Sequence, residues 1–142
     1  MEKLSDILFY NLDKAIRSYR AYAQKQLKAN GYNITIDQWL VIKAILENPG
    51  VSQQELAVMV FKDTASVTRI IELLVKAGYM TRDTDPADRR KTILAVNERG
   101  IKIIEDVQAV VLKNRAKALE GIEAGALQAT NETMKKIIRN VN

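Results

Sequence analysis

Residues 52–99 constrain the fold more than any other stretch, because a short helix, a turn, a second helix and a hairpin follow one another there. Ser52 with Glu55 three residues later forms a capping box, a pattern that begins a helix. Asp63 is placed to cap a second helix, which we expect over residues 64–77. Two helices joined by so short a turn predict a helix-turn-helix unit.

The second helix combines an apolar face with a polar stripe. At helical spacing, the residues that share the apolar face, and that we expect to be buried, are Val67, Ile70, Ile71, Leu74 and Ala77. The opposite stripe and its flanks contain Thr64, Ala65, Ser66, Thr68, Arg69, Glu72 and Lys76. Small hydroxyl side chains and one Arg on the first two turns can approach base edges and phosphates, as a helix in the major groove requires. For this helix alone, an ordinary amphipathic surface helix is the alternative.

A hairpin with a basic tip follows the second helix. Residues 79–84 and 92–96 are strand-like, and the turn between them reads Asp-Pro-Ala-Asp-Arg-Arg-Lys. Hairpin tips usually carry Asn, Gly or Asp, because these residues tolerate turn geometry. The cations Arg89, Arg90 and Lys91 add nothing to the turn itself, but they suit a projection that touches phosphate or enters a minor groove. The whole stretch therefore predicts a winged helix-turn-helix.

The same stretch resembles the MarR family (multiple-antibiotic-resistance regulators) of bacterial transcription factors. The residues that carry the resemblance are Asp63-Thr64-Ala65-Ser66-Val67-Thr68-Arg69, Gly78-Tyr79-Met80-Thr81-Arg82 and, in the wing, Asp88-Arg89-Arg90. Ala65 stands where the family often has Ser, which removes one hydrogen-bonding group. The resemblance covers nearly the whole chain, since the flanking helices also fit. It implies that Arg90 contacts DNA and that Asp88 helps to orient it.

Composition narrows the classes of function. The chain has 142 residues, which suits one domain, and a net charge of +5, which favours an anionic partner. Cys and His are both absent, so no disulfide, thiolate sensor, or Cys- or His-ligated metal site is possible. Without His, Cys or a Gly-rich phosphate loop, we expect neither an enzyme nor a cofactor. No signal peptide and no apolar run of spanning length occur, so we expect a soluble, cytoplasmic protein that does not contact the membrane.

Helices are also expected on both sides of the winged unit. By the same signals they cover residues 4–29, 35–48, 97–119 and 126–141, the second and third capped by Thr35 and Asn97. The apolar stripes of the first helix and of the last two helices are too apolar for solvent. They need a covering surface, either in the same domain or on another subunit. In MarR-type relatives both termini interlock across a two-fold axis, so the resemblance implies a homodimer. Two-fold proteins place their reading helices roughly 34 Å apart, about one turn of DNA.

We therefore predict a mostly α (α+β) fold, with a single domain over residues 1–142. Its winged helix-turn-helix part would be residues 35–99, and its dimerisation helices would lie in residues 1–30 and 100–142. The predicted function is a sequence-specific transcription regulator, a ligand-responsive homodimeric repressor of a pseudo-palindromic operator in double-stranded DNA. The reading helix would enter the major groove and the wing the minor groove. A winged-helix module that binds protein rather than DNA is the alternative.

The predicted site residues fall into two groups. The DNA contacts would be Ser52, Gln53, Gln54, Thr64, Ala65, Ser66, Thr68, Arg69, Asp88, Arg89, Arg90 and Lys91. The resemblance also implies a small aromatic or anionic effector that binds between the dimer helices and the reading unit. Tyr19, Tyr22 and Trp39 are candidates for the walls of that effector site, and core packing is the alternative for each.

Overall fold

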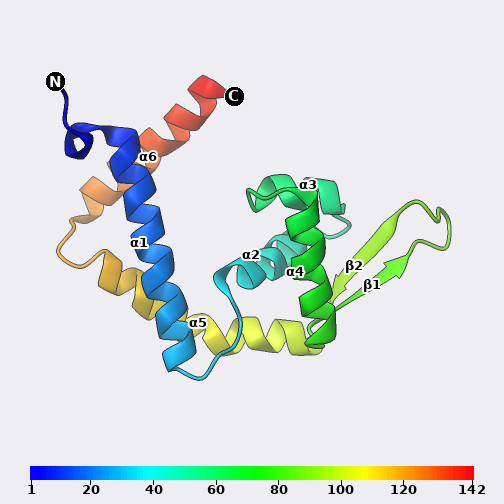
Figure 1. Cartoon of the computed structure of the whole chain (residues 1–142). Helices are drawn as coiled ribbons and strands as arrows, with labels where there is room; N and C mark the ends of the chain where they lie inside the picture. The colour runs from blue at the N-terminus through cyan, green and yellow to red at the C-terminus, as the bar shows by residue number, and fades with distance from the viewer.

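The computed structural model describes all residues, 1–142, as six α-helices and one two-stranded sheet. The elements are a 3₁₀ turn at Leu4–Asp6, α1 (Leu8–Ala29), α2 (Ile36–Glu47), α3 (Gln53–Met59), α4 (Thr64–Lys76), β1 (Met80–Thr84), β2 (Thr92–Val96), α5 (Glu98–Ala118) and α6 (Ala124–Val141). Figure 1 shows α2, α3, α4 and the hairpin gathered on one side and α1 and α6 on the other, with α5 running between the two groups. This arrangement confirms the mostly α fold with a winged helix-turn-helix.

Local capping signals explain where the helices of the winged unit begin. Each predicted cap forms, with a side-chain oxygen that accepts a hydrogen bond from the backbone N–H three residues later. The caps are Thr35 (3.0 Å), Ser52 (3.1 Å), Asp63 (2.7 Å) and Asn97 (3.0 Å). At the other end of α4, Gly78 has a φ of +83°, the left-handed conformation that stops a helix.

The first helix departs from the prediction. It was expected to begin at residue 4, but α1 begins at Leu8, after the separate 3₁₀ turn. Ile7 between them is extended, with φ −87° and ψ 117°, so the helical hydrogen bonds cannot continue through it. The side-chain amide of Asn11 donates to the carbonyl of Ser5 (2.9 Å), which stabilises this bend.

The core lies within the winged unit and against α5. The side chains that are almost fully buried include Ile42, Leu56, Val67, Ile71, Leu74, Met80 and Val107. They come from α2, α3, α4, β1 and α5, so the reading helix α4 is held by its inner face against a continuous apolar cluster. Two members of the predicted α4 face differ from expectation: Ile70 is half-buried, and Ala77 is exposed at the C-cap, where the helix has already ended.

The terminal helices leave apolar side chains uncovered. No residue of α6 is buried, and in α1 only Ala23 and Leu27, near its C-terminal end, are. Leu8 and Phe9 are more than half exposed at the N-terminal end of α1, where that helix lies beside α6 (Figure 1). The single chain therefore carries a surface that water solvates poorly. None of the helices has the length and apolar composition needed to cross a membrane.

Gly100, in the first turn of α5, permits a close approach between α5 and the backbone that precedes β1. A Cβ at this position would lie 2.2 Å from the carbonyl oxygen of Tyr79 and 2.5 Å from Cγ1 of Val96. We expect Gly100→Ala to lower the free energy of unfolding by about 1–3 kcal/mol, because the backbone must move to admit the methyl group. Urea denaturation followed by the fluorescence of Trp39 would measure the change.

Gly125 in α6 provides the matched control, since a Cβ there would meet no atom within 4 Å. Gly125→Ala should be neutral or slightly stabilising, because Ala favours a helix by about 1 kcal/mol over Gly. Equal stabilities of the two variants would show that the contact with Tyr79 does not limit packing.

Candidate nucleic-acid interface

The outer face of α4 presents the residues that the sequence predicts as the reading surface. Thr64, Ala65 and Arg69 are exposed, whereas Ser66 and Thr68 are half-buried. The hydroxyl of Thr68 donates to the carbonyl of Thr64 (2.9 Å) and accepts from the side-chain amide of Gln53 (3.1 Å). Thr68 therefore joins α4 to α3, and Arg69 is the only long, exposed side chain among these five residues.

A polar groove brings together the starts of α3 and α4 and the wing. Its volume is about 470 Å³, and no hydrophobic residue lines it. The lining residues are Gly50, Ser52, Gln53, Gln54, Glu55, Thr64, Arg82, Arg90, Lys91 and Thr92. Six predicted site residues from three separate segments thus share one depression. The other six predicted DNA contacts, Ala65, Ser66, Thr68, Arg69, Asp88 and Arg89, lie outside its walls.

The wing loop between β1 and β2 is shaped by its aspartates. Asp85 Oδ1 accepts from the amide of Ala87 (2.8 Å), and the amide of Asp85 donates to the carbonyl of Lys91 (3.0 Å). Asp88 Oδ1 accepts from both the amide of Arg90 (3.0 Å) and its side-chain Nε (3.3 Å). Acidic side chains therefore stabilise the turn, as such residues do in many loops.

The wing cations have little part in that folding. The Arg90 side chain is 92% exposed even though it pairs with Asp88. Arg89 and Lys91 are also exposed and form no ion pair within the chain. A contact between Asp88 and Arg90, implied by the family resemblance, is present. Three cations at the end of a hairpin are thus available to an anionic partner.

Sequence reasoning did not select Arg82 as a site residue, yet it lines the groove beside Arg90 and Lys91. Antiparallel pairing sets Arg82 opposite Leu94 within the hairpin, with the Arg82 side chain exposed. A cation in the strand that leads to the wing was the available signal, but its place in the groove depends on strand register and on α3. The groove also contains one acid, Glu55, which completes the capping box by accepting from the amide of Ser52 (3.4 Å).

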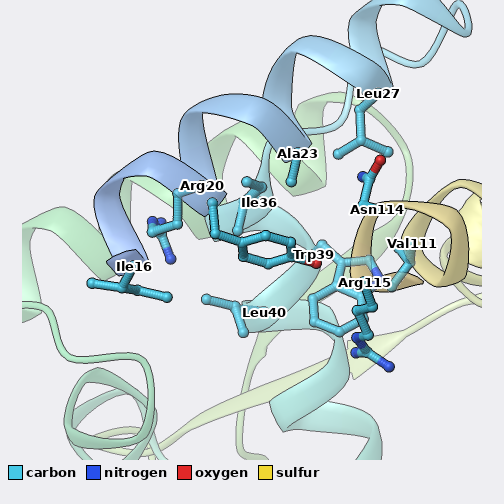
Figure 2. Close-up of a pocket in the computed structure, with 11 residues that line it drawn as sticks. Ile16, Arg20, Ala23, Leu27, Ile36, Trp39, Leu40, Val111, Asn114 and Arg115 are labelled. Carbon is cyan, nitrogen blue, oxygen red and sulfur yellow. The ribbon is translucent and has the colours of Figure 1, made fainter. Parts of the chain in front are cut away.

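An apolar cavity lies on the other side of the molecule, between α1, α2 and α5 (Figure 2). Its volume is about 180 Å³, and its walls are Ile16, Tyr19, Arg20, Ala23, Leu27, Ile36, Trp39, Leu40, Val111, Asn114 and Arg115. Trp39 is one of these wall residues, and its indole Nε1 is buried without a hydrogen-bond partner, which is uncommon for a buried donor. Of the three predicted effector residues, Tyr19 and Trp39 line the cavity, and Tyr22 does not.

Comparison with known proteins shows which winged-helix family the reading unit matches. Residues 34–92, which include α2, the helix-turn-helix and the wing, match the MarR family. A Thauera aromatica protein named for transcriptional regulation of the hcr operon is 29% identical over 98 residues, which are 69% of this chain. The helix-turn-helix and wing of this chain are thus of the MarR type. The match spans 58% of the length of that Thauera protein.

Solved structures agree with the MarR fold over nearly all of the chain. A structure of Bordetella bronchiseptica BpsR, whose DNA binding is regulated by 6-hydroxynicotinic acid, gives a TM-score of 0.85 at 20% identity and covers 96% of both chains. Rhodococcus jostii RHA1 CouR bound to p-coumaroyl-CoA gives a TM-score of 0.81 at 24% identity, covering 96% of this chain and 95% of that one. At these identities the likeness establishes the fold, including the long terminal helices that the MarR family model does not reach.

Proposed function

We propose that this protein is a sequence-specific DNA-binding transcription regulator that acts as a ligand-responsive homodimeric repressor. The observation that carries the proposal is the polar groove, which is lined by the start of α3, the start of α4 and two of the wing cations, Arg90 and Lys91. A strand of DNA phosphates beside this groove would meet Arg82, Arg90 and Lys91 together, while Thr64, Ala65 and Arg69 reach toward bases. Residues 35–99 would then form the DNA-binding part.

The proposed homodimer is supported by the uncovered apolar surface of the terminal helices. Residues 1–30 and 100–142 would pack across a two-fold axis, which would cover the apolar side chains at the N-terminal end of α1 and along α6 that the single chain leaves exposed. A dimer also fits the proposed target, since two reading helices related by a two-fold axis match a pseudo-palindromic operator in double-stranded DNA.

An effector is supported by the cavity between α1, α2 and α5. A dry cavity of about 150 Å³ admits benzene, so a cavity of about 180 Å³ suits a single aromatic ring. Arg20 and Arg115 lie in its walls and can pair with an anion. These groups favour a small aromatic acid. The molecules named for BpsR and CouR likewise combine an aromatic ring with anionic groups.

A protein-interaction module remains a second candidate, because one apolar patch lies on the helix-turn-helix itself. Val58 is 76% exposed at the end of α3, and Phe61 is 92% exposed in the turn that follows. Such side chains suit a protein partner rather than phosphate. This candidate, however, gives no role to the wing cations.

Selection from a pool of random-sequence duplexes would decide between the two functions. We expect the wild-type protein to enrich a pseudo-palindromic sequence, with an affinity that falls steeply as salt concentration rises. Recovery of unrelated duplexes only, with no enriched sequence, would remove the regulator from consideration.

The reading helix gives a specific prediction on the selected duplex. We expect Arg69→Ala to reduce affinity by about 1–3 kcal/mol if the guanidinium reads a guanine, and to relax the preference at one base position. Glu72 lies one turn further along the same stripe of α4, where the helix should already be leaving the major groove of the DNA. Glu72→Gln is therefore the control, and it should preserve the preference. Repeating the selection with each variant measures both effects, and an unaltered preference with Arg69→Ala would mean that another face of the protein reads DNA.

A further inference from the structure

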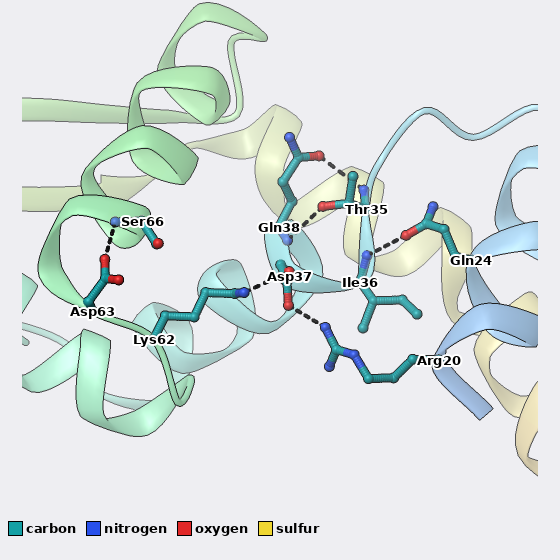
Figure 3. Close-up of polar contacts among 9 residues, drawn as sticks. All are labelled: Arg20, Gln24, Thr35, Ile36, Asp37, Gln38, Lys62, Asp63 and Ser66. Carbon is teal, nitrogen blue, oxygen red and sulfur yellow. Dashed lines mark hydrogen bonds and ion pairs between the residues drawn. The ribbon is translucent and has the colours of Figure 1, made fainter. Parts of the chain in front are cut away.

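One carboxylate, that of Asp37 at the start of α2, joins three parts of the chain (Figure 3). Its Oδ1 accepts a hydrogen bond from the guanidinium of Arg20 on α1, and its Oδ2 lies 3.1 Å from Nζ of Lys62. The three side chains are only 30–38% exposed. Because Lys62 belongs to the turn between α3 and α4, the carboxylate ties that turn to α1.

The Asp37 carboxylate that makes this connection is negatively charged near neutral pH. Burial raises the pKa of the Asp37 carboxyl, but the hydrogen bonds and charges of Lys62 and Arg20 together outweigh it, so that the pKa lies below its usual value. Each carboxylate oxygen is held by a different cation, and charge-assisted bonds of this kind are stronger than neutral ones. Loss of either cation leaves the other bond intact but breaks the connection between α1 and the turn.

The position of Lys62 bears directly on the first turn of α4. The next residue, Asp63, caps that helix by accepting from the amide of Ser66, a bond that also lowers the pKa of Asp63. The preceding residue, Phe61, has a φ of +61°, a conformation that residues with a side chain rarely adopt. The amide of Lys62 itself donates to the carbonyl of Ala57 (3.0 Å). Because this turn is tight, it has few alternative conformations. Displacement of Lys62 therefore also displaces the start of α4.

At its α1 end, this connection between α1 and the turn reaches the apolar cavity. Arg20, which holds Asp37, also lines that cavity with Trp39 and Arg115 (Figure 2). A guanidinium has five N–H donors, so Arg20 can be approached from the cavity while it binds Asp37. The same side chain thus connects the cavity with the turn before the reading helix.

We propose that Asp37 is a positioning residue for DNA reading, whose carboxylate fixes the first turn of α4 relative to α1 by holding Arg20 and Lys62 at once. The inference rests on the proposed function, because positioning is measured here as affinity for DNA. Because Arg20 also lines the cavity, an anion bound there that draws Arg20 away from Asp37 would break the connection between α1 and the turn, which links the cavity to the reading helix.

The test compares Asp37→Asn, Arg20→Met and Lys62→Met on the duplex that the wild-type protein selects. Each substitution is expected to reduce affinity roughly five- to tenfold, the usual size of coupling within one network. For Asp37→Asn a loss of DNA affinity is informative, because removal of a negative charge would by itself strengthen binding to phosphate. The slope of log affinity against log salt should stay unchanged in this variant, since no phosphate contact is lost.

The double variant Arg20→Met/Lys62→Met tests the connection itself. Arg20 and Lys62 bind different oxygens of Asp37, so they depend on each other only through that carboxylate. The double variant should lose no more affinity than whichever of the two single variants binds DNA more weakly. Asp37→Glu, which keeps the charge, should recover part of the affinity lost in Asp37→Asn.

Glu47→Gln provides the matched control, because Glu47 pairs with Lys43 (3.6 Å) on the exposed surface of α2, the helix that carries Asp37, and joins no second element. It should leave DNA affinity unchanged. Folding of Asp37→Asn is expected, since Gln24 holds the start of α2 to α1 independently, through Ile36 (2.9 Å) and Ile34 (3.3 Å). Were that variant to unfold on heating far below the wild type, the Arg20 and Lys62 variants would decide instead.

Wild-type affinity in Asp37→Asn, or a double-variant loss equal to the product of the two single losses, would overturn the inference. Either result would leave the proposed function intact, since the wild-type protein would still have selected its duplex. Failure of the wild-type protein to select any duplex would instead remove the proposed function and this inference together.

Discussion

Removal of residues 1–12 is expected to abolish the dimer and, with it, high-affinity DNA binding. This segment carries apolar side chains that the single chain leaves in water: Leu4 is 61% exposed, Leu8 53% and Phe9 62%. Complete burial of one such side chain contributes about 1.5–3 kcal/mol, so a second chain that covers several of them gains substantial free energy. The shortened protein should dissociate or aggregate, because the apolar surface of α6 loses its partner as well.

The effect on DNA follows from the loss of linked half-sites. Two connected reading units bind more tightly than one, by a factor on the order of 10²–10⁴ when the geometry allows both to engage. Light scattering at micromolar concentration and binding to the selected duplex would measure both consequences. Leu8→Lys should reproduce the defect in the full-length chain, and Lys14→Ser, an exposed change in the same helix, should not. A full-length protein that runs as a monomer and still binds its duplex tightly would exclude the proposed assembly.

Elements that depend on nearby residues could be predicted from the sequence. The caps at Thr35, Ser52, Asp63 and Asn97 each need only a residue three positions away, and all of them form. The hairpin and the stop at Gly78 follow equally local rules. For the same reason the interruption at Ile7 was missed: helical spacing of apolar residues continues through it, while the bend depends on a single side-chain bond from Asn11.

Features that depend on tertiary contacts could not be predicted in this way. No spacing rule connects Asp37 with Arg20 or Lys62, which lie 17 and 25 positions away in the chain. The place of Arg82 in the groove depends on where the hairpin lies across that groove from α3, and the absence of Tyr22 from the cavity depends on how α1 packs on α2 and α5. Composition and periodicity thus indicated the kind of site, and packing determined several of its members.

Arg90→Ala is expected to weaken DNA binding strongly while leaving the fold almost unchanged. Its side chain is 92% exposed and pairs only with Asp88, and exposed pairs of this kind contribute little to stability. Exposed substitutions away from special features usually alter the free energy of unfolding by less than about 0.5 kcal/mol. The melting temperature should therefore match that of the wild type. Any loss of affinity then reports on contact with DNA rather than on folding.

Two roles of Arg90 at the DNA predict different patterns of loss. If the guanidinium neutralises a phosphate, its removal should flatten the dependence of log affinity on log salt by about one unit per wing, and by about twice that in a dimer. If it enters a narrow A·T-rich minor groove, the loss should be larger for duplexes with A·T-rich flanks than for those with G·C-rich flanks. Titrations at several salt concentrations on both kinds of duplex separate the two roles.

Lys28→Ala, which removes an exposed cation from the last turn of α1, is the control and should change neither the DNA affinity nor its salt dependence. An Arg90→Ala protein with wild-type melting, affinity and salt dependence would exclude the wing from DNA binding, and the exposed patch of Val58 and Phe61 would then make the protein-interaction module the leading function.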